Sequence, residues 1–406
     1  MLKFLGKAFL IIALIAATVY GWIYFTIKAD VEELASNKNT AVDEIIEEPE
    51  KEVAESEDSD EEIDISNVKV VDKEEISDKL NVVPTLVDTL TTNSAWCGTM
   101  QLIWNDMIDE VLGTKPVFEE SLLIAENLNK QTFTERDLSE KYYYKKYGIK
   151  NLDLKAEIEK GIKDKFGETS DVLDKIDWSA SALDPETAGV DRYLFYAMLK
   201  REFQFPIEFD VLDKGKFGTQ DNVNYFGIET STSKSVDKQL NVLYYENEDD
   251  FALEIETKDS DKIVLVRKDK FETNFKDIYN VVKARANSYE GNKEFDTIDT
   301  FKMPNLEFDV LRNYNELVGK TFKTPDGMGE INAAMQTIKL KLDNKGGEIK
   351  SEAVMDVTFT SSIILEPENK EPRHFNCDEE FVMFLVEDGK ENPYFAVKVD
   401  DITLFQ

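Results

Sequence analysis

Histidine and cysteine are nearly missing from this sequence, and their scarcity excludes several kinds of chemistry. The 406 residues include one histidine, His374, and two cysteines, Cys97 and Cys377. A single histidine cannot build a histidine-rich metal site, and a Ser-His-Asp triad would have to use His374, which no G-x-S-x-G motif accompanies. We therefore interpret His374, which lies beside Pro372 and Arg373, as a loop side chain.

Basic residues are also few. The chain has 48 Lys and Arg residues against 83 Asp and Glu residues, which gives a net charge of -35. Such a field repels polyanions, so we expect no nucleic-acid partner. The stretch VGKT at 318–321 is similar to the end of a phosphate-binding loop, but Tyr314 stands where the first glycine is needed. We expect no metal and no other cofactor.

Carboxylates are the one catalytic residue type in good supply. A glycosidase uses two of them, but nothing in an acidic sequence separates a catalytic carboxyl group from a solvated one. A carboxylate-based hydrolase therefore stays open as a minor hypothesis. The favoured interpretation is that the chain is not an enzyme.

The N-terminal region contains a long apolar run. Residues 8–27, AFLIIALIAATVYGWIYFTI, carry no charge and can cross a hydrocarbon layer of ~30 Å at ~1.5 Å per residue. Lys3 and Lys7 precede the run, which places residues 1–7 in the cytoplasm. We predict a single-pass anchor in the cell membrane. A cleaved secretory signal is the alternative, and in both cases the bulk of the chain is extracytoplasmic.

An acidic segment follows the predicted anchor. Residues 41–66 contain many carboxylates, one lysine and no aromatic residue, so 28–83 should form an extended flexible tether. Calcium binding is disfavoured because the spaced ligands and the glycine of an EF-hand loop are missing. Folded structure is expected near Pro84, which gives one domain at 84–406.

The residue pattern of the domain predicts helices in its first part and strands in its later part. Helical spacing predicts a helix that starts at Asn93 or Ser94 and ends at Gly113. Further helices are expected at 118–128, 135–146, 152–167 and 189–203. Later segments rich in β-branched and aromatic residues predict strands at VNYFGIE, LNVLYYE, FALEIET, KIVLVRK, TFKMPNLEFDV and MQTIKLKL, with one more helix at 274–289 capped by Thr273.

This order of elements predicts an α+β fold. A helical first half would pack on a large mixed or antiparallel sheet system. Because the domain is expected outside the cytoplasm, Cys97 and Cys377 could form a disulfide, with two buried free thiols as the alternative.

The C-terminal region carries a family resemblance. Phe375-Asn376-Cys377-Asp378, followed by FVMFLV at 381–386, resembles the C-terminal signature of the serpins, and YFAVKV at 394–399 is similar to their last strand. Upstream, LFYAMLKREFQFPIEF, FKMPNLEFDV and IKLKLDNKGGEIKSEAVMD are similar to serpin strands in the same order. The resemblance covers residues ~190 to 406 and implies a serpin-like fold in which an exposed loop can engage a protease.

The resemblance also implies a hinge and an exposed loop. The residues that match the hinge of the reactive loop are Lys350, Ser351, Glu352, Ala353, Val354, Met355 and Asp356. Ser351, Ala353 and Met355 would face one way along a strand and Glu352, Val354 and Asp356 the other. A permanently paired strand after the DNKGG turn is the alternative to a hinge that inserts. Ile363, Ile364 and Leu365 would form the tip of the exposed loop, or else a short buried strand.

These observations predict a membrane-anchored, extracytoplasmic protein-binding domain without catalytic residues. The resemblance implies an extracellular protein partner, a protease, while Lys350 and the bulky Val354, Met355 and Val357 make inhibitory trapping doubtful. The alternative is a structural or assembly protein of the cell envelope that inhibits no protease.

Overall fold

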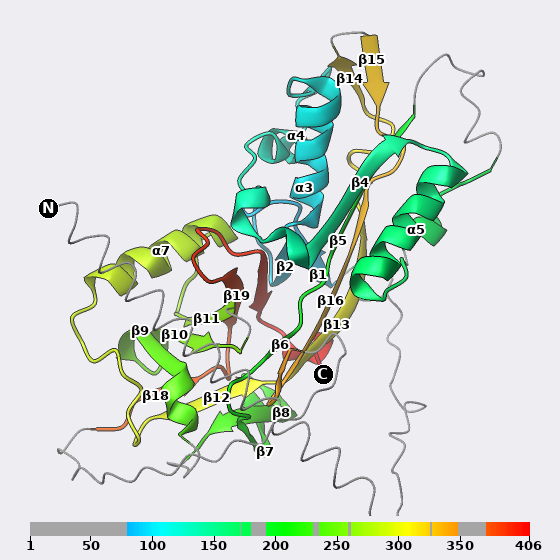
Figure 1. Cartoon of the computed structure of the whole chain (residues 1–406). Coiled ribbons are helices and arrows are strands. Elements are labelled where there is room, and N and C mark those ends of the chain that lie inside the picture. The colour runs from blue at the N-terminus through cyan, green and yellow to red at the C-terminus, as the bar shows by residue number, and fades with distance from the viewer. Residues whose placement is uncertain are drawn as a thin grey trace, which may run out of the picture. The chain divides into compact units, whose positions relative to one another are not determined.

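The computed structural model describes residues 79–170, 172–179, 192–229, 235–258, 261–324, 327–347 and 371–406. Figure 1 shows the arrangement of their helices and strands. The predicted cytoplasmic end, the anchor at 8–27 and the acidic run at 41–66 lie outside these ranges. Within them, no helix combines the length and the apolar character needed to cross a membrane.

The largest sheet joins strands from both ends of the domain. Its order is β1-β2-β20-β19-β11-β10-β9, with β1 and β2 parallel and every other neighbouring pair antiparallel. Both predicted hairpins, β10 with β11 and β19 with β20, are confirmed. The bounds are β1 Leu80–Val82, β2 Asn93–Cys97, β9 Leu240–Asn247, β10 Asp250–Glu256, β11 Asp261–Arg267, β19 Phe381–Glu387 and β20 Phe395–Val399.

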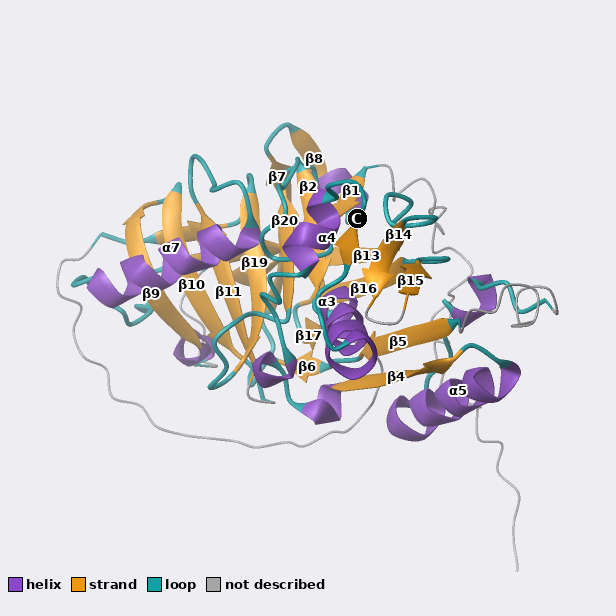
Figure 2. Ribbon diagram, turned by 90° about the horizontal axis from the view of Figure 1, so that it is seen from above, coloured by secondary structure: helices purple, strands orange, loops and turns teal. Residues whose placement is uncertain are grey.

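Helix α7, Phe275–Ser288, covers one face of this sheet (Figure 2). The Phe384 ring of β19 lies 6.0 Å from the Phe275 ring and 5.2 Å from the Tyr279 ring, centroid to centroid. The helix begins one residue later than predicted. Its N-cap is Asn274, whose side chain accepts a hydrogen bond from the backbone N–H of Asp277, so the predicted cap at Thr273 is wrong.

A second, four-stranded sheet has the order β18-β12-β8-β7. Aromatic rings fill the space on one side of it, with Phe209 lying 5.7 Å from Phe226 and 5.2 Å from Phe301. The predicted strand VNYFGIE is confirmed in β8, and the predicted strand TFKMPNLEFDV divides at Asn305, with only TFKMP in this sheet as β12. The bounds are β7 Asp210–Phe217, β8 Gln220–Ile228, β12 Thr300–Pro304 and β18 His374–Asn376.

Two groups of strands make up the region that contains the candidate site. One is a sheet of order β13-β16-β17-β6 and the other is the pair β4-β5. The bounds are β4 Tyr143–Ile149, β5 Tyr193–Leu199, β6 Phe203–Gln204, β13 Leu306–Asn313, β16 Met335–Asp343 and β17 Gly346–Gly347. Helix α5, Leu152–Phe166, confirms the prediction for 152–167 and packs on β4 and β5 through a hydrophobic cluster of its own.

Helix α3, Thr99–Asp106, lies between the large sheet and β5 and continues as a π-helix at Met107–Leu112. It ends as predicted at Gly113, which has the left-handed φ of 63°. Its predicted start is wrong, because Asn93–Cys97 is strand β2. Gly98 separates the two elements, and a Cβ atom there would lie 2.3 Å from the Phe133 ring.

The remaining elements surround the far end of α3 or link the sheets. They are α4 at Leu123–Leu128, a small sheet of order β15-β14-β3 (β3 Val117–Phe118, β14 Thr321–Thr324, β15 Gly327–Glu330) and 3-10 helices at Glu135–Asp137, Glu140–Tyr142, Leu173–Lys175, Val236–Gln239 and Ile402–Leu404.

Two predicted helices are strands, so the helical first half is wrong in part. Residues 135–146 contain two 3-10 turns and the start of β4, and 189–203 contain β5. β4 and β5 pair along their full length, from Tyr143 with Leu199 to Ile149 with Tyr193. Aromatic residues favour strands over helices. The pairing of β4 with β5, and the packing of α5 on this pair, stabilise the strand conformation of both segments. The predicted helix at 118–128 shortens to α4.

The fold class itself is confirmed. Helices and several mixed or antiparallel sheets form an α+β architecture, with one main hydrophobic cluster between the two larger sheets and smaller clusters around α4 and α5.

Candidate functional site: a lane between two strands

Strands β5 and β16 each keep one open edge in the part of the chain that the structure describes. β5 pairs with β4 on one side, and β16 pairs with β13 on one side. On its other side β16 pairs only at its last two residues, where Leu342 and Asp343 face Gly347 and Gly346 of β17. Open edges expose backbone N–H and C=O groups that can bind a further strand.

The short strand β17 shows that the space between the two groups is one strand wide at this end. β17 is antiparallel to β16 on one side and antiparallel to β6 on the other. β6 follows β5 in the chain after Lys200, Arg201 and Glu202. We call the space between β5 and β16, beyond β17, the lane.

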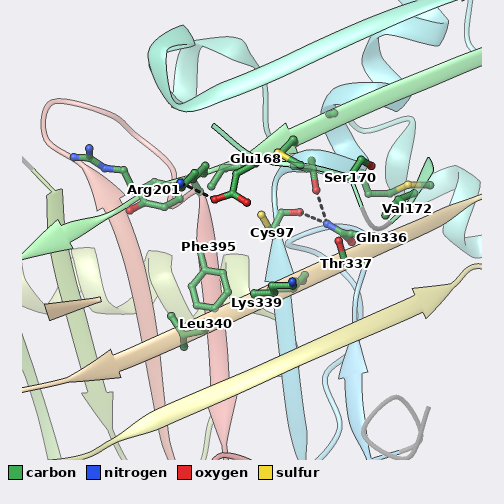
Figure 3. A pocket seen from close by; sticks show the side chains of 18 of the residues that line it. Cys97, Glu168, Ser170, Val172, Arg201, Gln336, Thr337, Lys339, Leu340 and Phe395 are labelled. Atoms are coloured by element: carbon green, nitrogen blue, oxygen red, sulfur yellow. Dashed lines mark hydrogen bonds and ion pairs between the residues drawn. The ribbon is translucent and has the colours of Figure 1, made fainter. Parts of the chain in front are cut away.

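A cavity of about 220 Å³ occupies the lane. Its lining includes consecutive residues of both strands, 195–201 from β5 and its continuation and 335–341 from β16. Figure 3 shows Gln336, Thr337, Lys339 and Leu340 along one side of it, with Cys97 and Phe395 of the large sheet behind. The lane therefore has a floor made by β2, β20 and α3.

Gln336 fixes β16 to this floor. Its Nε2 donates to the backbone oxygen of Cys97 at 3.1 Å and to Thr99 Oγ1 at 2.7 Å. Its Oε1 accepts from the Tyr314 hydroxyl at 2.7 Å. Burial raises the pKa of Tyr314 above its usual range, so this hydroxyl stays a donor. Both N–H donors of the Gln336 amide thus bind the floor, and the amide oxygen accepts one hydrogen bond from Tyr314, which follows β13.

A buried ion pair closes the end of the lane near β17. Arg201 forms an ion pair with Asp261, whose side chain is fully buried at the start of β11. The guanidinium also lies 3.7 Å above the centre of the Tyr142 ring. This contact ties the end of β5 to the large sheet, because breaking a buried pair leaves an uncompensated charge.

The rim of the lane carries charge on its outer side. Lys200 forms an ion pair with Glu168 at 2.8 Å, and Lys339 forms one with Asp309 at 3.3 Å. Among the described residues that line the cavity, Glu168 alone has a carboxylate. The lane therefore lacks the pair of carboxyl groups that a glycosidase needs.

The residues predicted for the hinge and the exposed loop, 350–356 and 363–365, lie outside the described residues. So does the continuation of the strand expected after the DNKGG turn. The structure describes the two ends of this stretch, Gly347 in β17 and Glu371 before β18.

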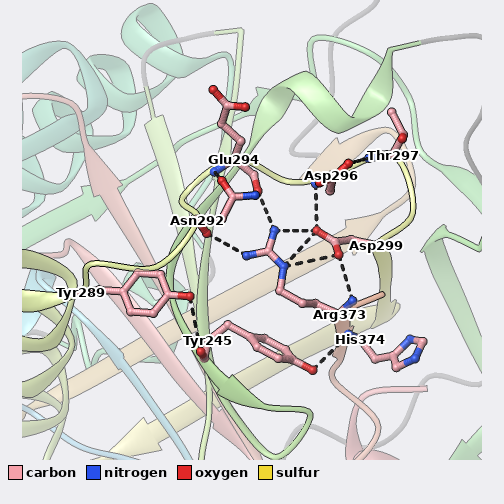
Figure 4. A network of polar contacts seen from close by, with 9 residues as sticks. All are labelled: Tyr245, Tyr289, Asn292, Glu294, Asp296, Thr297, Asp299, Arg373 and His374. Atoms are coloured by element: carbon pink, nitrogen blue, oxygen red, sulfur yellow. Dashed lines mark hydrogen bonds and ion pairs between the residues drawn. The ribbon is translucent and has the colours of Figure 1, made fainter. Parts of the chain in front are cut away.

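Polar contacts of Arg373 and His374 hold the start of β18 in place (Figure 4). Arg373 forms an ion pair with the buried Asp299 at 2.6 Å and donates to the backbone oxygens of Asn292 and Glu294. His374, predicted to be a loop side chain, is the first residue of β18, and its Nδ1 lies 2.8 Å from Thr300 Oγ1.

The two cysteines are buried free thiols, so of the two possibilities left open by the sequence the disulfide is not formed. Cys97 belongs to β2 in the large sheet, whereas Cys377 follows β18 and bonds through its backbone N–H to Lys302 of β12. They belong to different sheets. Burial raises the pKa of Cys97, and it raises the pKa of Cys377 to about 12.

The sequence did not single out Gln336 or Arg201, which have central places around the lane. A glutamine in an alternating strand looks like an outward residue. Only its place two residues before Ile338 and four before Leu340, on the same face of the strand, could have indicated the burial of Gln336.

No protein-family model matches the sequence, and no curated protein matches it. The structure is similar to solved serpins. Serpin48, a highly specific serpin of the insect Tenebrio molitor, is 12% identical at a TM-score of 0.42, over 76% of this chain and 92% of that chain.

Two further serpins show the same level of similarity. The mouse protein-Z dependent protease inhibitor is 12% identical at a TM-score of 0.45, over 76% of this chain and 91% of that one. Human thyroxine-binding globulin complexed with thyroxine is 11% identical at a TM-score of 0.36, over 73% of this chain and 94% of that chain. A similarity at these identities and TM-scores assigns no role to any residue of this chain.

Proposed function

We propose that this domain works by accepting a β-strand in the lane, and that its partner is an extracytoplasmic protease. The observation that carries the proposal is the lane itself, a space one strand wide above β2, β20 and α3, with a strand edge on each side that no described strand pairs with. Addition of a strand to such edges is a common mode of peptide recognition. In this proposal residues 8–27 anchor the protein in the cell membrane and the domain has no catalytic role.

The strand that would enter is the continuation of β17. Leu342 faces Gly347 in an antiparallel register, so continuing that register places Ser351 opposite Ile338 and Ala353 opposite Gln336. Cross-strand partners lie on the same face of a sheet. Gln336, Ile338 and Leu340 are buried, which directs the side chains of Ser351 and Ala353 toward the floor.

The register with β6 and β5, on the other side of the lane, predicts the same orientation of residues 351 and 353. Gly347 also faces Phe203, and continuing that register places Ser351 opposite Leu199 and Ala353 opposite Ala197. Leu199 packs against the main core, and Ala197 lines the cavity. Both edges therefore assign the small residues 351 and 353 to the floor, and they assign Lys350, Glu352 and Asp356 to the outer face.

This register answers part of the sequence-based argument against inhibitory trapping. The charged residues need not be buried, so a strand can bind. Lys350, however, would lie between Lys339 and Lys200, and like charges on neighbouring strands repel. We expect entry to be slow, which favours stable binding over the rapid insertion that trapping a protease requires.

The experiment compares synthetic peptides of residues 348–358 added to the purified full chain. The native peptide should raise the thermal midpoint. A peptide with Ser351→Asp should bind at least tenfold more weakly, since a charge would enter the floor, whereas Glu352→Gln should bind within about threefold of the native peptide. Equal effects of both substitutions, or no binding by the native peptide, would refute the strand-accepting lane.

A second arm tests the protease partner. Limited cleavage within residues 357–366 should raise the thermal midpoint of the domain, and incubation with serine or cysteine proteases should yield complexes that contain both proteins. An adduct stable in SDS would show that trapping occurs despite Lys350. If cleavage leaves the midpoint unchanged and no protease binds, the envelope-assembly alternative replaces this proposal.

A further inference from the structure

Exposed apolar side chains gather at one end of the domain. Among the described residues, eight large apolar side chains are exposed. Two of them stand apart, Leu123 at the start of α4 and Val211 on β7. The other six form a surface that we call the apolar end, made up of Val117, Ile149, Leu152, Tyr193, Val318 and Met328. Single exposed apolar residues are common, but a concentration of them is typical of a binding surface.

One part of the apolar end lies on the small sheet of β3, β14 and β15. Val117, Lys323 and Met328 are cross-strand partners and form one row across the three strands. The next row, which contains Phe322, has the opposite orientation, and Phe322 is buried in the hydrophobic cluster beneath the sheet. The Val117 row therefore faces outward, and the Val117 side chain is 61% exposed.

The other part lies at the end of the β4–β5 pair. Ile149 and Tyr193 are cross-strand partners there, and Leu152, which is 58% exposed, follows as the first residue of α5. The Tyr193 ring stacks on the Phe195 ring at 6.3 Å between centroids, and Phe195 packs on the same cluster as Phe322. Both parts thus border one cluster, and both views show β14 and β15 beside this end of β4 and β5 (Figures 1 and 2).

The apolar end is less acidic than the chain as a whole. The whole chain has 48 cations and 83 carboxylates. Within two residues of the six apolar side chains, the cations are Lys115, Lys150, Arg192 and Lys320, and the carboxylates are Glu119, Asp153, Asp191, Glu316, Asp326 and Glu330. Lys323 in the outward row adds a fifth cation. An anionic lipid surface therefore repels this end less strongly than the average surface of the chain.

We propose that the apolar end docks on the surface of a lipid bilayer. The inference rests on the membrane location in the proposed function and adds the orientation of the domain on that membrane. β7 and β18 lie at the opposite end of the domain (Figure 1). Docking would therefore turn the end that carries β18 away from the bilayer, toward an extracytoplasmic partner.

The lysine in the outward row favours lipid over a protein as the occupant. Protein interfaces have few charged residues at their centre, whereas Lys323 lies between Val117 and Met328. A second copy packed on this row by two-fold symmetry would bring two Lys323 ammonium groups together. On a bilayer, the lysine stem lies along apolar surface while the ammonium group reaches the headgroup phosphates. Tyrosine, as at Tyr193, is also enriched at membrane interfaces.

The length of the chain before the domain permits this orientation. Residues 28–78 separate the predicted anchor from Lys79, where the described residues begin. At ~3.4 Å per residue this stretch reaches at most ~170 Å, several times the ~50 Å width expected for a domain of this size. Chain length therefore does not decide which end of the domain faces the bilayer, and the surface chemistry does.

The test measures contact with lipid in the full chain, inserted into vesicles of phosphatidylcholine and phosphatidylglycerol. An environment-sensitive fluorophore is attached at Val117→Cys or Leu152→Cys. The matched control is Val211→Cys, another exposed valine on a strand, at the opposite end of the domain. Nitroxide groups on the lipid acyl chains should quench the labels at 117 and 152 about threefold more than the label at 211. The unsubstituted chain, treated with the same reagent, corrects for labelling of the two native cysteines.

Substitutions away from the label test whether the two parts dock together. With the label at 117, Leu152→Asp should reduce the quenching to the level seen at 211, because a carboxylate opposes contact with the bilayer. Lys323→Glu should do the same through repulsion from anionic headgroups. Val211→Asp is the control and should leave the quenching at 117 unchanged.

The outcomes separate the docking from the anchor and from self-association. Equal quenching at 117, 152 and 211 would overturn the docking. An emission shift at 117 that depends on protein concentration and not on nitroxide lipid would assign the apolar end to a second copy of the chain, which overturns it as well. If the full chain does not float with the vesicles, the anchor and the docking are both wrong. If it floats and no label is quenched, the docking alone is wrong.

Discussion

The large sheet and the lane use the same kind of strand for opposite purposes. In β19 all seven residues are buried on both faces, and both edges of the strand are paired. In β16 buried and exposed residues alternate, and one edge is open along most of its length. A strand that is buried on both faces and paired on both edges can only support the fold. A strand with one edge that no described strand pairs with, lying over a packed floor, can still bind a further strand.

The largest expected effect comes from breaking the saturated region. Phe384→Ala removes a ring packed against Phe275 and Tyr279. The free energy of unfolding of the protein should therefore fall by about 3–5 kcal/mol. Denaturant unfolding of the full chain measures this loss. Phe195→Ala at the lane should cost less, because its ring lines a cavity that is already present. Equal losses would contradict the difference between the two regions.

An alkaline pH titration examines a second buried position, Cys377, which lies beside β18 and β12 and away from the lane. The raised pKa of Cys377 means that its thiol stays protonated in the folded protein up to pH about 12, while the unfolded chain loses that proton near 9.0. The folded state therefore holds more protons in this window. Stability should fall with rising pH by about 1.4 kcal/mol per unit from this group between these values.

The matched variant is Cys377→Ala, which removes the titrating group. Urea unfolding between pH 9 and 10.5 should show a slope that is shallower by about that amount in the variant. An identical slope in both proteins would show that Cys377 is not buried as the structure describes.

Filling the lane should affect binding more than stability. Ala197→Phe places a ring in the cavity of about 220 Å³, so the 348–358 peptide should bind at least tenfold more weakly. The free energy of unfolding should change by less than about 1 kcal/mol, because space for the ring exists. Ala197→Ser leaves the cavity open and is the control. Unchanged peptide affinity in Ala197→Phe would place the binding site elsewhere.

The smallest effect concerns the two thiols, which differ in their distance from the lane. Cys97 lines the cavity of the lane, and Cys377 does not. A small uncharged alkylating reagent should therefore modify Cys97 several times faster than Cys377 in the folded protein. Bound peptide should cancel this difference, as peptide mass analysis after quenching would show. Faster reaction of Cys377 would contradict the floor described for the lane.

The two regions also differ in what the sequence could reveal. The strands of the saturated sheet are continuous apolar runs separated by turn residues, and β10, β11 and β19 were predicted from those runs alone. Helix α5 was predicted for a similar reason, because Leu154, Ile158 and Ile162 recur at helical spacing and bury one face.

Of the two strands that border the lane, β16 was predicted at MQTIKLKL, whereas the residue pattern of β5 predicted a helix. β5 has aromatic and long apolar residues on both faces, Tyr196 toward α5 and Phe195 toward α3, so no alternation of polar and apolar residues marks it as a strand. Cys97 was considered only as a disulfide partner. Gln336 acquires its role from a contact with Thr99 of α3, which lies 237 residues away in the chain. Local patterns carry no information about such partners.

The most direct measurement of the central claim is amide hydrogen exchange of the full chain with and without the 348–358 peptide. Strand addition protects the amides that face the new strand. We predict slower exchange in β5 and β16, and no change in β7, an edge strand of the second, four-stranded sheet, or in β9, an edge strand of the large sheet. Protection at β7 or β9 instead, or at no strand, would contradict the lane as the strand-binding site.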